Sequence, residues 1–394
     1  MNSAVQSQIF LALTKSTADF DWLQEALRPM GQVLSGGRGD LDELLALIDV
    51  TGATLLFVGL ERSNLVTQTA LIEGVLEAKP LIAVVALGDG LDNQLVLGAM
   101  RAGARDFIAY GSRTSEVTGL VRHLGRRAPQ SAPEREGGAV TALFSSQPES
   151  DAAQLALHLG IVTHSLGKQT LVLDLGQIRA EALLELGLET SFYFGDALRN
   201  LRRLDANLIE SAFCRAPNGM RLLSLGNADN SLSEASPAEL YLLIGTLRQH
   251  FQHIVINLSG QGDCEPLRVL LSHAEHVLWY VDQSVPACQR NLLQLSAWRD
   301  AGLRVEQFSL VIDRYSREVA PDDKTLGKSF ELEVAEVLPA SWALRMNAKN
   351  QARSMFEVSP HDALCQRISQ LGHRLLGVRQ DKGGRWRLWP RKSS

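Results

Sequence analysis

Residues 253–281 of the chain read HIVINLSGQGDCEPLRVLLSHAEHVLWYV, and this stretch decides the fold class. Its two ends, His253–Leu258 and His276–Val281, are apolar runs of strand length, separated by a segment long enough for a helix. Strands that are buried on both faces are apolar throughout, and parallel strands need a long crossover between them. The stretch therefore predicts a strand–helix–strand unit of a parallel sheet.

Further apolar runs of strand length, separated by segments long enough for a helix, lie on both sides of this stretch. We therefore predict one doubly wound α/β domain over residues 139–378, with a parallel sheet covered on both faces. The further strands of this domain are expected at AVTALF (139–144), TLVLDL (170–175), RLLSL (221–225) and FSLVID (308–313).

The first third of the chain carries a second alternation of strand and helix patterns. Five units of this kind over residues 1–127 predict a flavodoxin-like, doubly wound domain with right-handed crossovers. Residues 128–138 combine charges with proline and glycine and have no hydrophobic period, which predicts a linker. The expected strands are Ile9–Thr14, Gln32–Leu34, Thr54–Val58, Leu81–Ala86 and Asp106–Ala109, and the expected helices are Asp21–Pro29, Leu41–Ile48, Thr67–Glu77, Leu91–Ala102 and Thr114–Leu124.

Composition excludes several classes of function. The 394 residues are 45% hydrophobic and carry a net charge of −5, which gives no overall attraction to nucleic acid or anionic lipid. The four cysteines lie far apart, so they indicate neither a disulfide framework nor a metal site. No positive charge precedes the short apolar run near the N-terminus, and no stretch has the ~18 apolar residues of a membrane helix. We expect a cytoplasmic protein.

The phrase AMRAGARDFIAYG (99–111) resembles the helix 4–strand 5 junction of two-component receiver domains. Phosphoryl transfer in that family needs acids that hold Mg²⁺, an acceptor aspartate, a hydroxyl and a lysine. Here Lys15 follows strand 1, Gly59 stands at the acceptor position and Tyr110 at the lysine position. Asp21 and Asp106 remain, and we interpret them as a solvated helix-start aspartate and a turn aspartate. The resemblance thus implies a degenerate receiver-like domain without phosphotransfer, used for docking and dimerisation.

From residue 139 onward a series of phrases resembles the MinD/ParA superfamily of ATPases, and most closely its TadZ/CpaE pilus-assembly branch. The resemblance implies a P-loop NTPase-like domain behind the receiver-like domain. The phrases, in chain order, are GKQTLVLDLG (167–176), FGDALRN (194–200), HIVINLSG (253–260), AEHVLWYVDQSVPACQRNLLQL (274–295), VIDRYSRE (311–318) and NQARSMFEVSPHDAL (350–364).

Nucleotide binding in that superfamily depends on a loop of the form KGGxGKT, whose backbone N–H groups, lysine and hydroxyl hold the phosphates and Mg²⁺. The corresponding residues, 147–154, contain neither glycine nor lysine, and two acids would face a triphosphate. We call residues 147–154 the loop segment and expect it to bind no cofactor and no metal, while Ser150 or Asp151 caps the following helix. The loop segment consists of Gln147, Pro148, Glu149, Ser150, Asp151, Ala152, Ala153 and Gln154.

Of three further family positions, one is kept and two differ from the family. Asp174 persists on the second strand of the domain, Asn257 replaces the switch II aspartate, and Asp313 stands where the family has an asparagine near the base. No catalytic residues are therefore predicted, and ATP hydrolysis is not expected. We interpret the two Gly-Lys phrases at 167–168 and 327–328 as turn or helix-cap residues, and His250 with His253 as a capping and solvent pair.

The C-terminal residues 379–394 form a basic tail in which cations alternate with tryptophan between Arg385 and Lys392. Such a tail could lie on an anionic membrane surface, remain solvated or dock on a partner.

The family resemblance implies a non-catalytic localisation and assembly scaffold for Flp/Tad type IVb pilus biogenesis, at the cell pole and peripheral to the inner membrane. Its expected partners are the Tad-type secretion ATPase, the pilus machinery and a second copy of the chain. Apolar helical faces around Leu91–Met100 and Leu292–Trp298 are candidate contacts of a dimer that needs no nucleotide. The alternatives are an active MinD/ParA-type ATPase that binds ATP with an unusual loop, or a pseudo-receiver regulatory protein.

Overall fold

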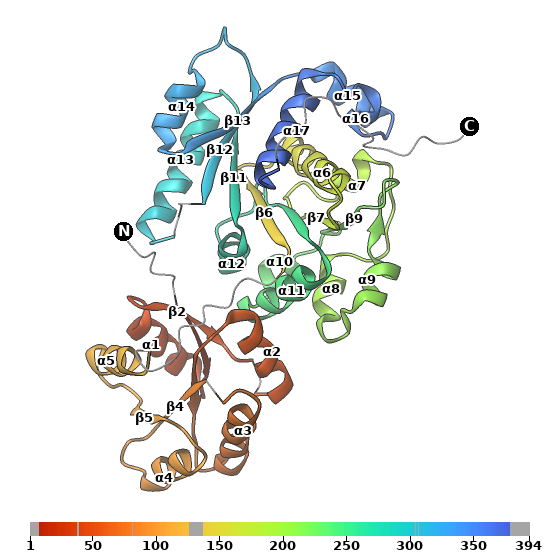
Figure 1. Ribbon diagram of the computed structural model, residues 1–394. Helices are drawn as coiled ribbons and strands as arrows, with labels where there is room; N and C mark the ends of the chain where they lie inside the picture. Colours follow the sequence, from red (N-terminus) through yellow and green to blue (C-terminus); the bar gives the residue numbers. More distant parts are fainter. Residues whose placement is uncertain are drawn as a thin grey trace. The chain divides into compact units, whose positions relative to one another are not determined.

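The computed structural model describes residues 8–37, 39–80, 82–125, 137–303, 305 and 307–378. These residues form two compact units, each of which contains one sheet (Figure 1). The linker predicted at 128–138 lies largely outside the described residues, and the tail predicted at 379–394 lies wholly outside them.

The first unit is a five-stranded parallel sheet with the strand order β2-β1-β3-β4-β5. This order is that of flavodoxin-like folds, so the fold predicted for the N-terminal third is confirmed. The strands are β1 (Gln8–Leu13), β2 (Gly31–Ser35), β3 (Leu55–Gly59), β4 (Ala83–Gly88) and β5 (Asp106–Ala109), and the helices are α1 (Thr17–Leu27), α2 (Leu41–Thr51), α3 (Leu65–Ala78), α4 (Asn93–Arg101) and α5 (Thr114–Gly125).

The central strand of this unit, β3, is buried at all five positions because helices cover both faces of the sheet. On one face, Phe10 and Phe57 pack edge to face with ring centroids 6.3 Å apart, below Leu23 of α1 and Val117 of α5.

The second unit is an eight-stranded sheet with the order β13-β12-β11-β6-β10-β7-β9-β8. All neighbours are parallel except β8, which pairs antiparallel with β9. Its strands are β6 (Ala139–Phe144), β7 (Thr170–Asp174), β8 (Cys214–Arg215), β9 (Arg221–Ser224), β10 (His253–Asn257), β11 (His276–Val281), β12 (Phe308–Tyr315) and β13 (Glu333–Pro339). Its helices are α6 (Ser150–Ser165), α7 (Glu181–Glu185), α8 (Phe194–Arg199), η1 (Leu201–Arg203), α9 (Ala206–Ala212), α10 (Ser231–Glu234), α11 (Pro237–His250), α12 (Glu265–His273), α13 (Val285–Asp300), α14 (Asp323–Phe330), α15 (Trp342–Asn350), α16 (Met355–Val358) and α17 (Ala363–Leu375).

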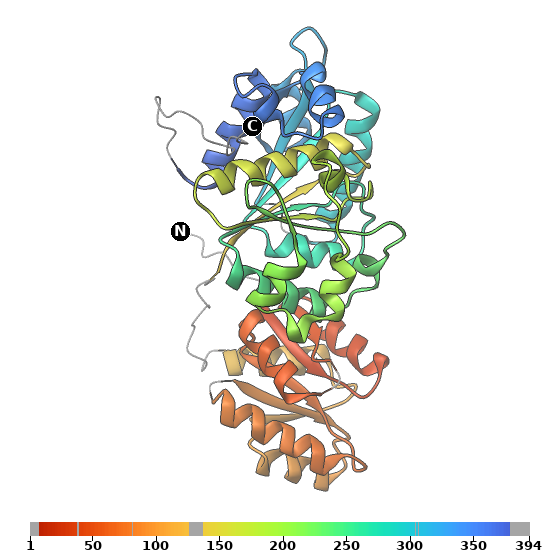
Figure 2. The same ribbon diagram turned by 90° about the vertical axis from the view of Figure 1, so that its right-hand side faces the viewer.

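Both faces of this sheet are covered. Figure 2 shows α6 (yellow) crossing one face, where it packs with α17 against β7, β10 and β13. On the other face, an aromatic cluster joins strands β6 and β11 to α13, since Phe144, Trp279 and Trp298 lie 4.7–5.4 Å apart by ring centroid. The six strands predicted for this domain are all present, whereas β8 and β13 were not predicted.

In the part of the chain that the structure describes, no helix has the length and apolar character that crossing a bilayer requires.

Candidate functional site

The loop between β6 and α6 lies at the carboxyl edge of the second sheet, where parallel α/β folds place their sites. Hydrogen bonds from neighbouring elements hold this loop in place. Asn291 of α13 accepts the Ser146 N–H at 2.9 Å, and the Gly260 N–H donates to the Ser145 carbonyl at 2.8 Å. Gly260 has φ +74°, and a Cβ there would come within 2.6 Å of the Pro148 nitrogen. The loop is therefore held closely by the segment after β10.

The start of α6 differs from the sequence expectation. Glu149 is the N-cap residue and makes no side-chain cap hydrogen bond, so neither Ser150 nor Asp151 caps the helix. The Ser150 hydroxyl instead accepts from the Lys349 ammonium at 3.3 Å. The prediction was wrong because a cation from α15 engages this side chain, and sequence reasoning had not placed that cation here.

Three cations converge on Asp151, the second acid of the loop segment. Arg314, Arg345 and Lys349 each place a nitrogen 3.7 Å from an Asp151 carboxylate oxygen. Arg314 is the last residue but one of β12 and has φ +52°. Arg345 and Lys349 lie four residues apart on α15 and so share one face of that helix. Asp151 thereby links α6 to β12 and α15.

Two of these cations also bind other carboxylates. Arg314 pairs with Glu149 at 3.3 Å and with Asp282, after β11, at 2.9 Å. Lys349 pairs with Glu181 of α7 at 3.1 Å. Burial raises the pKa of Glu149, although Arg314 pulls it the other way. The acids and cations around the loop thus form one connected network.

The third cation, Arg345, has its main partner deeper in the domain. Its guanidinium donates to Asp313 at 2.5 Å, and the Tyr280 hydroxyl donates to the other Asp313 oxygen at 2.5 Å. Asp313 and Arg345 are both buried, with side-chain exposures of 0% and 6%. Desolvation raises the pKa of Asp313, and the positive charge of Arg345 partly offsets this rise. The predicted family position Asp313 is therefore fully engaged within the chain.

The end of the loop segment points into the core. Ala152 and Ala153 are buried apolar residues of α6. The Gln154 side chain, also fully buried, donates to Glu185 of α7 and accepts from Arg345 at 3.3 Å. Burial raises the pKa of Glu185 to about 8. At the other end, Gln147 accepts from Arg290 of α13 at 3.0 Å.

Asp174 and Asn257 lie side by side at the ends of β7 and β10. The Asn257 amide donates to Asp174 at 2.8 Å, and the Ala182 N–H donates to the other Asp174 oxygen at 2.9 Å. Both side chains are buried, and desolvation raises the pKa of Asp174. Gly176 leaves room for this pair, since a Cβ there would lie 2.5 Å from the Asn257 amide nitrogen.

Sequence reasoning missed the cations of the site and their buried partners. The one available signal was the i, i+4 spacing of Arg345 and Lys349, which is also typical of a solvated helix face. The missed residues are Glu181, Glu185, Tyr280, Asp282, Arg314, Arg345 and Lys349.

Among the other predicted features, Gly167 has φ +83° in the turn before β7, and Gly327 and Lys328 lie in the last turn of α14. The interpretation of His253 was wrong. This residue is buried in β10, its Nε2 lies 3.2 Å from the Thr141 hydroxyl, and burial lowers its pKa to about 4.

The carboxyl edge of the first sheet holds Gly59 and Tyr110, which stand at the positions of the receiver acceptor and lysine in the sequence comparison above. The Tyr110 hydroxyl lies over Gly59, where a Cβ would approach it to 2.5 Å. Burial raises the pKa of Tyr110 to about 12. Lys15 pairs with Glu61 at 2.7 Å. An open hollow of about 580 Å³ lies beside these residues.

The two acids singled out in this domain lie elsewhere than predicted. Asp21 is exposed, but it lies in the second turn of α1, whose N-cap is Ser16, and Asp106 is a strand residue and not a turn residue. The Asp106 carboxylate accepts the Phe107 N–H at 2.8 Å.

The N-terminal part of the chain matches the family model described as "Pilus assembly protein TadZ N-terminal" over residues 6–135. A solved CheY-like protein, TadZ of Pseudomonas aeruginosa PAO1, is 60% identical and is covered over 100% of its length by 30% of this chain, with a TM-score of 0.30. No match is found among curated protein sequences.

The larger domain is similar to solved ATPases. A ParA family ATPase from Chlorobium tepidum TLS is 14% identical, with 60% of this chain covering 98% of it at a TM-score of 0.54. MinD in the MinC:MinD complex of Aquifex aeolicus is 16% identical, with 63% of this chain covering 99% of it at a TM-score of 0.51. At such identities the likeness shows the fold alone. The predicted MinD/ParA-type, P-loop NTPase-like fold is confirmed.

Proposed function

The chain belongs to the TadZ family of pilus assembly proteins, and from this premise we propose a non-catalytic role for it. It serves as a localisation and assembly scaffold of a Flp/Tad type IVb pilus, and it recruits the secretion ATPase of that machine to the cell pole. Nucleotide takes no part in this role.

The observation that carries the proposal is the charge balance around the loop segment. With every group ionised, the ion-pair network that includes the loop segment has five carboxylates and three cations, and each of these cations already has a carboxylate partner. Arg290, which contacts Gln147, lies outside this network. A nucleotide triphosphate would add negative charge where negative charge is in excess. The carboxylates are Glu149, Asp151, Glu181, Asp282 and Asp313, and the cations are Arg314, Arg345 and Lys349.

The loop segment also lacks the glycines and the lysine that hold a phosphate chain, and its one hydroxyl, that of Ser150, accepts from Lys349. Glycines allow backbone N–H groups to curl around phosphates, a lysine bridges them, and a hydroxyl binds the metal. Ala153 and Gln154 are buried where the hydroxyl would be needed, and the Gln154 amide is occupied by Glu185 and Arg345. Loss of one partner of a buried charge pair costs about 2–5 kcal/mol, so several losses move a micromolar site beyond millimolar. These residues do not fit a magnesium nucleotide.

Calorimetric titration of the full chain with ATP and Mg²⁺ tests the proposal. We expect no binding heat up to about 1 mM, no phosphate release and no shift of the melting temperature. A micromolar isotherm would overturn the proposal and favour an active ATPase with an unusual loop.

Support for a membrane contact comes from the sequence of residues 379–394 alone. This tail carries six cations and one acid, whereas the whole chain has a net charge of −5, and it contains Trp386 and Trp389. Cations with tryptophan favour an anionic bilayer surface. Co-sedimentation with vesicles containing phosphatidylglycerol should require residues 379–394, and a deletion variant that still binds would contradict this part of the proposal.

Self-association without nucleotide is the last part of the proposal. Of the two predicted contact faces, the one around Leu292–Trp298 is mostly core, because Leu295 and Trp298 are buried. On this face Leu293 is exposed. The face at 91–100 is more open, with Leu91, Leu97 and Met100 exposed.

A further inference from the structure

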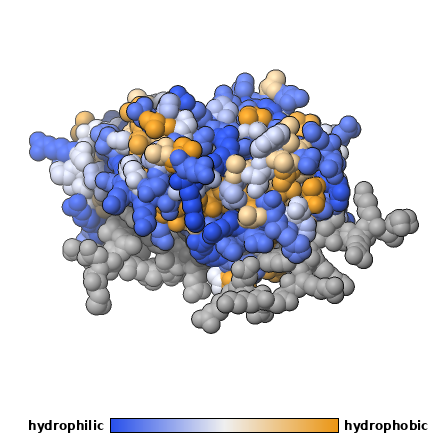
Figure 3. Space-filling model, turned by 90° about the horizontal axis from the view of Figure 1, so that it is seen from above, coloured by the Kyte–Doolittle hydropathy of each residue, from blue (hydrophilic) through white to orange (hydrophobic). Residues whose placement is uncertain are grey.

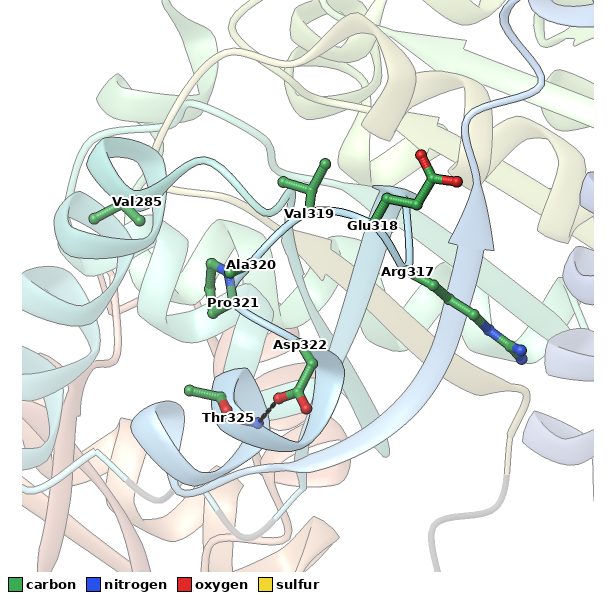
Figure 4. Close-up of a pocket in the computed structure, with 8 residues that line it drawn as sticks. All are labelled: Val285, Arg317, Glu318, Val319, Ala320, Pro321, Asp322 and Thr325. Atoms are coloured by element: carbon green, nitrogen blue, oxygen red, sulfur yellow. Dashed lines mark hydrogen bonds between the residues drawn. The ribbon is translucent and has the colours of Figure 1, made fainter.

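Residues 314–322 form the end of β12 and the loop that joins it to α14, and we call them the strap. The loop of the strap stands at the top of Figure 1 and forms one wall of an open hollow of about 680 Å³, which Figure 4 shows in close-up. On the face viewed in Figure 3, apolar side chains form separate clusters bordered by hydrophilic ones. Val319 of the strap is 52% exposed, so burial of apolar surface contributes little to holding the strap in place.

A single buried side chain holds the loop of the strap. The Gln283 amide nitrogen donates to three backbone carbonyls, those of Ser316, Val319 and Pro321, at 3.1, 2.7 and 2.9 Å. Its amide oxygen accepts the Ser316 N–H at 2.7 Å. Gln283 is only 7% exposed. Among the described residues, every hydrogen bond that reaches residues 316–321 from outside the strap comes from this side chain.

The other end of the strap is held by the residue next to Gln283. Asp282 accepts the Arg314 guanidinium at 2.9 Å. Arg314 has φ +52°, and the pairing of β12 with β13 is irregular between Ile312 and Tyr315. A residue other than glycine keeps this left-handed backbone only where its surroundings hold it, and such residues cluster in segments that switch. The turn after β11 thus fixes both ends of the strap.

Arg314 connects the strap to the loop segment. Its guanidinium lies 3.3 Å from Glu149 and 3.7 Å from Asp151, whose side chains are 22% and 18% exposed. Of the described residues, Arg314 is the one cation that forms an ion pair with Glu149. Glu149 is the N-cap residue of α6 but makes no side-chain cap hydrogen bond, so its contact with Arg314 orients this side chain.

We propose that the strap is a conformational latch on the loop segment. While Gln283 holds the strap closed, Arg314 lies among the acids and fixes the start of α6. When the strap opens, Arg314 moves away with it, and only Arg345 and Lys349 remain to offset the same carboxylates. Opening thus loosens the start of α6 and makes this edge of the sheet more acidic, a change to which a charged partner would respond. The inference concerns how the loop segment is held, so it does not depend on the proposed scaffold role.

Hydrogen–deuterium exchange of the full chain, measured peptide by peptide, tests the latch. Gln283→Leu removes all four hydrogen bonds and leaves the sequence of the strap unchanged. One lost hydrogen bond changes an opening equilibrium by about two- to tenfold, so exchange at residues 315–320 should rise at least about tenfold. Exchange at residues 149–155 should rise at least about twofold as well, because Arg314 is then released.

Arg314→Gln separates the latch from a purely local role of Gln283. It should raise exchange at residues 149–155 to a similar extent while residues 315–320 stay protected, because Gln283 still holds the loop of the strap. Gln307→Leu is the matched control. Gln307 is another part-buried glutamine that donates to a backbone carbonyl, at 3.1 Å, but it lies at the opposite end of β12, so both segments should exchange as in wild type.

Faster exchange of the strap alone in Gln283→Leu, with residues 149–155 unchanged, overturns the latch. Unchanged exchange at residues 149–155 in Arg314→Gln overturns it too, and this second result can be read whether or not Gln283→Leu folds. Neither outcome bears on the titration with ATP, which tests the proposed function separately.

Discussion

The two domains keep the same kind of sheet but fill the carboxyl edge of that sheet in different ways. In the receiver-like domain, bulk fills it, because the Tyr110 hydroxyl occupies the space above Gly59. In the MinD/ParA-like domain, charge fills it, because Asp151 meets Arg314, Arg345 and Lys349. An edge filled by bulk and an edge filled by charge should differ in how single substitutions change the free energy of unfolding.

The difference lies in what a single substitution leaves behind. Removing bulk from a hydroxyl–glycine contact leaves a small space, whereas removing one partner of a buried ion pair leaves an uncompensated charge. The second domain should therefore be the more sensitive to single substitutions at the carboxyl edge of its sheet. The first should respond mainly to added volume.

The largest effect is expected from Arg345→Met. This substitution leaves Asp313 buried without its cation, and breaking such a pair by removing one partner costs about 3–5 kcal/mol. Urea unfolding followed by circular dichroism measures the change in the free energy of unfolding.

The surface pair Arg299–Glu331 provides the control, because Glu331 is 76% exposed. Arg299→Met should cost at most about 1 kcal/mol. Adding Asp313→Leu to Arg345→Met should recover part of the loss, since no lone charge then remains. A loss below about 1 kcal/mol for Arg345→Met would break the comparison, because charge would then not dominate the second site.

The second largest effect is expected in the pH dependence of stability, through the buried carboxyl of Glu185 in the second domain. Glu185 has a folded pKa of about 8 because of burial, against 4.5 for the ordinary side chain. The folded chain thus binds a proton that the unfolded chain releases between these values, so stability falls as pH rises from about 5 to 8. Glu185→Gln cannot titrate and should flatten this fall by about 2–3 kcal/mol over that interval.

Urea unfolding of both proteins from pH 5 to 8.5 gives the two slopes. His158, whose pKa is lowered to about 4 by burial, loses its stabilising contribution as pH falls from 6.5 toward 4, but it does so in both proteins and cancels. Glu189→Gln, which alters an exposed carboxyl, should follow the wild-type profile. Parallel slopes for wild type and Glu185→Gln would contradict the expectation.

Sequence reasoning predicted the strands better than it predicted the side-chain contacts at the carboxyl edges of the two sheets. Strands β7 and β10 are buried along their whole length and have an unbroken apolar centre at residues 171–173 and 254–256, so the pattern alone identifies them. Strand β13 lies at a sheet edge and contains Glu333 and Glu336, so no continuous apolar run marks it. Glu336 is nevertheless buried, because Arg367 and Arg374 of α17 pair with it.

The same limit applies to the candidate site. The absence of glycine and lysine from the loop segment is visible in the letters, and so is the change at Gly59. The convergence of Arg345 and Lys349 on Asp151 depends on chain segments almost 200 residues apart, which only the folded topology brings together. A strand-start histidine such as His253 likewise gives no sign of whether its ring faces solvent or core.

The steric side of the comparison is tested by Gly59→Ala. The new Cβ would lie 2.5 Å from the Tyr110 hydroxyl and 3.1 Å from the Leu13 carbonyl oxygen, so the substitution should cost about 1–3 kcal/mol through overpacking. Adding Tyr110→Phe removes the hydroxyl and should recover much of the loss, as read from thermal unfolding.

Gly119→Ala in α5 is the matched control, because its Cβ would meet nothing within 4 Å and alanine is the better helix former. Equal losses for Gly59→Ala with and without the Tyr110 hydroxyl would show that bulk does not fill this site.

The smallest effect is expected from Arg314→Gln, and it separates exposed from buried charge within one network. Arg314 contacts Glu149, Asp151 and Asp282, more carboxylates than any other cation of the site, yet its side chain is 38% exposed. Water and salt screen such contacts, so their loss should cost only about 0.5–1 kcal/mol at low salt and less at 0.5 M NaCl. Arg345, with fewer contacts but 6% exposure, should show a larger loss with little salt dependence. Urea unfolding of both variants at 20 mM and 500 mM NaCl, about a fivefold range in screening length, decides between burial and the number of contacts. If Arg314→Gln proves as costly as Arg345→Met at both salt concentrations, the number of ion pairs, and not their desolvation, stabilises this edge of the sheet.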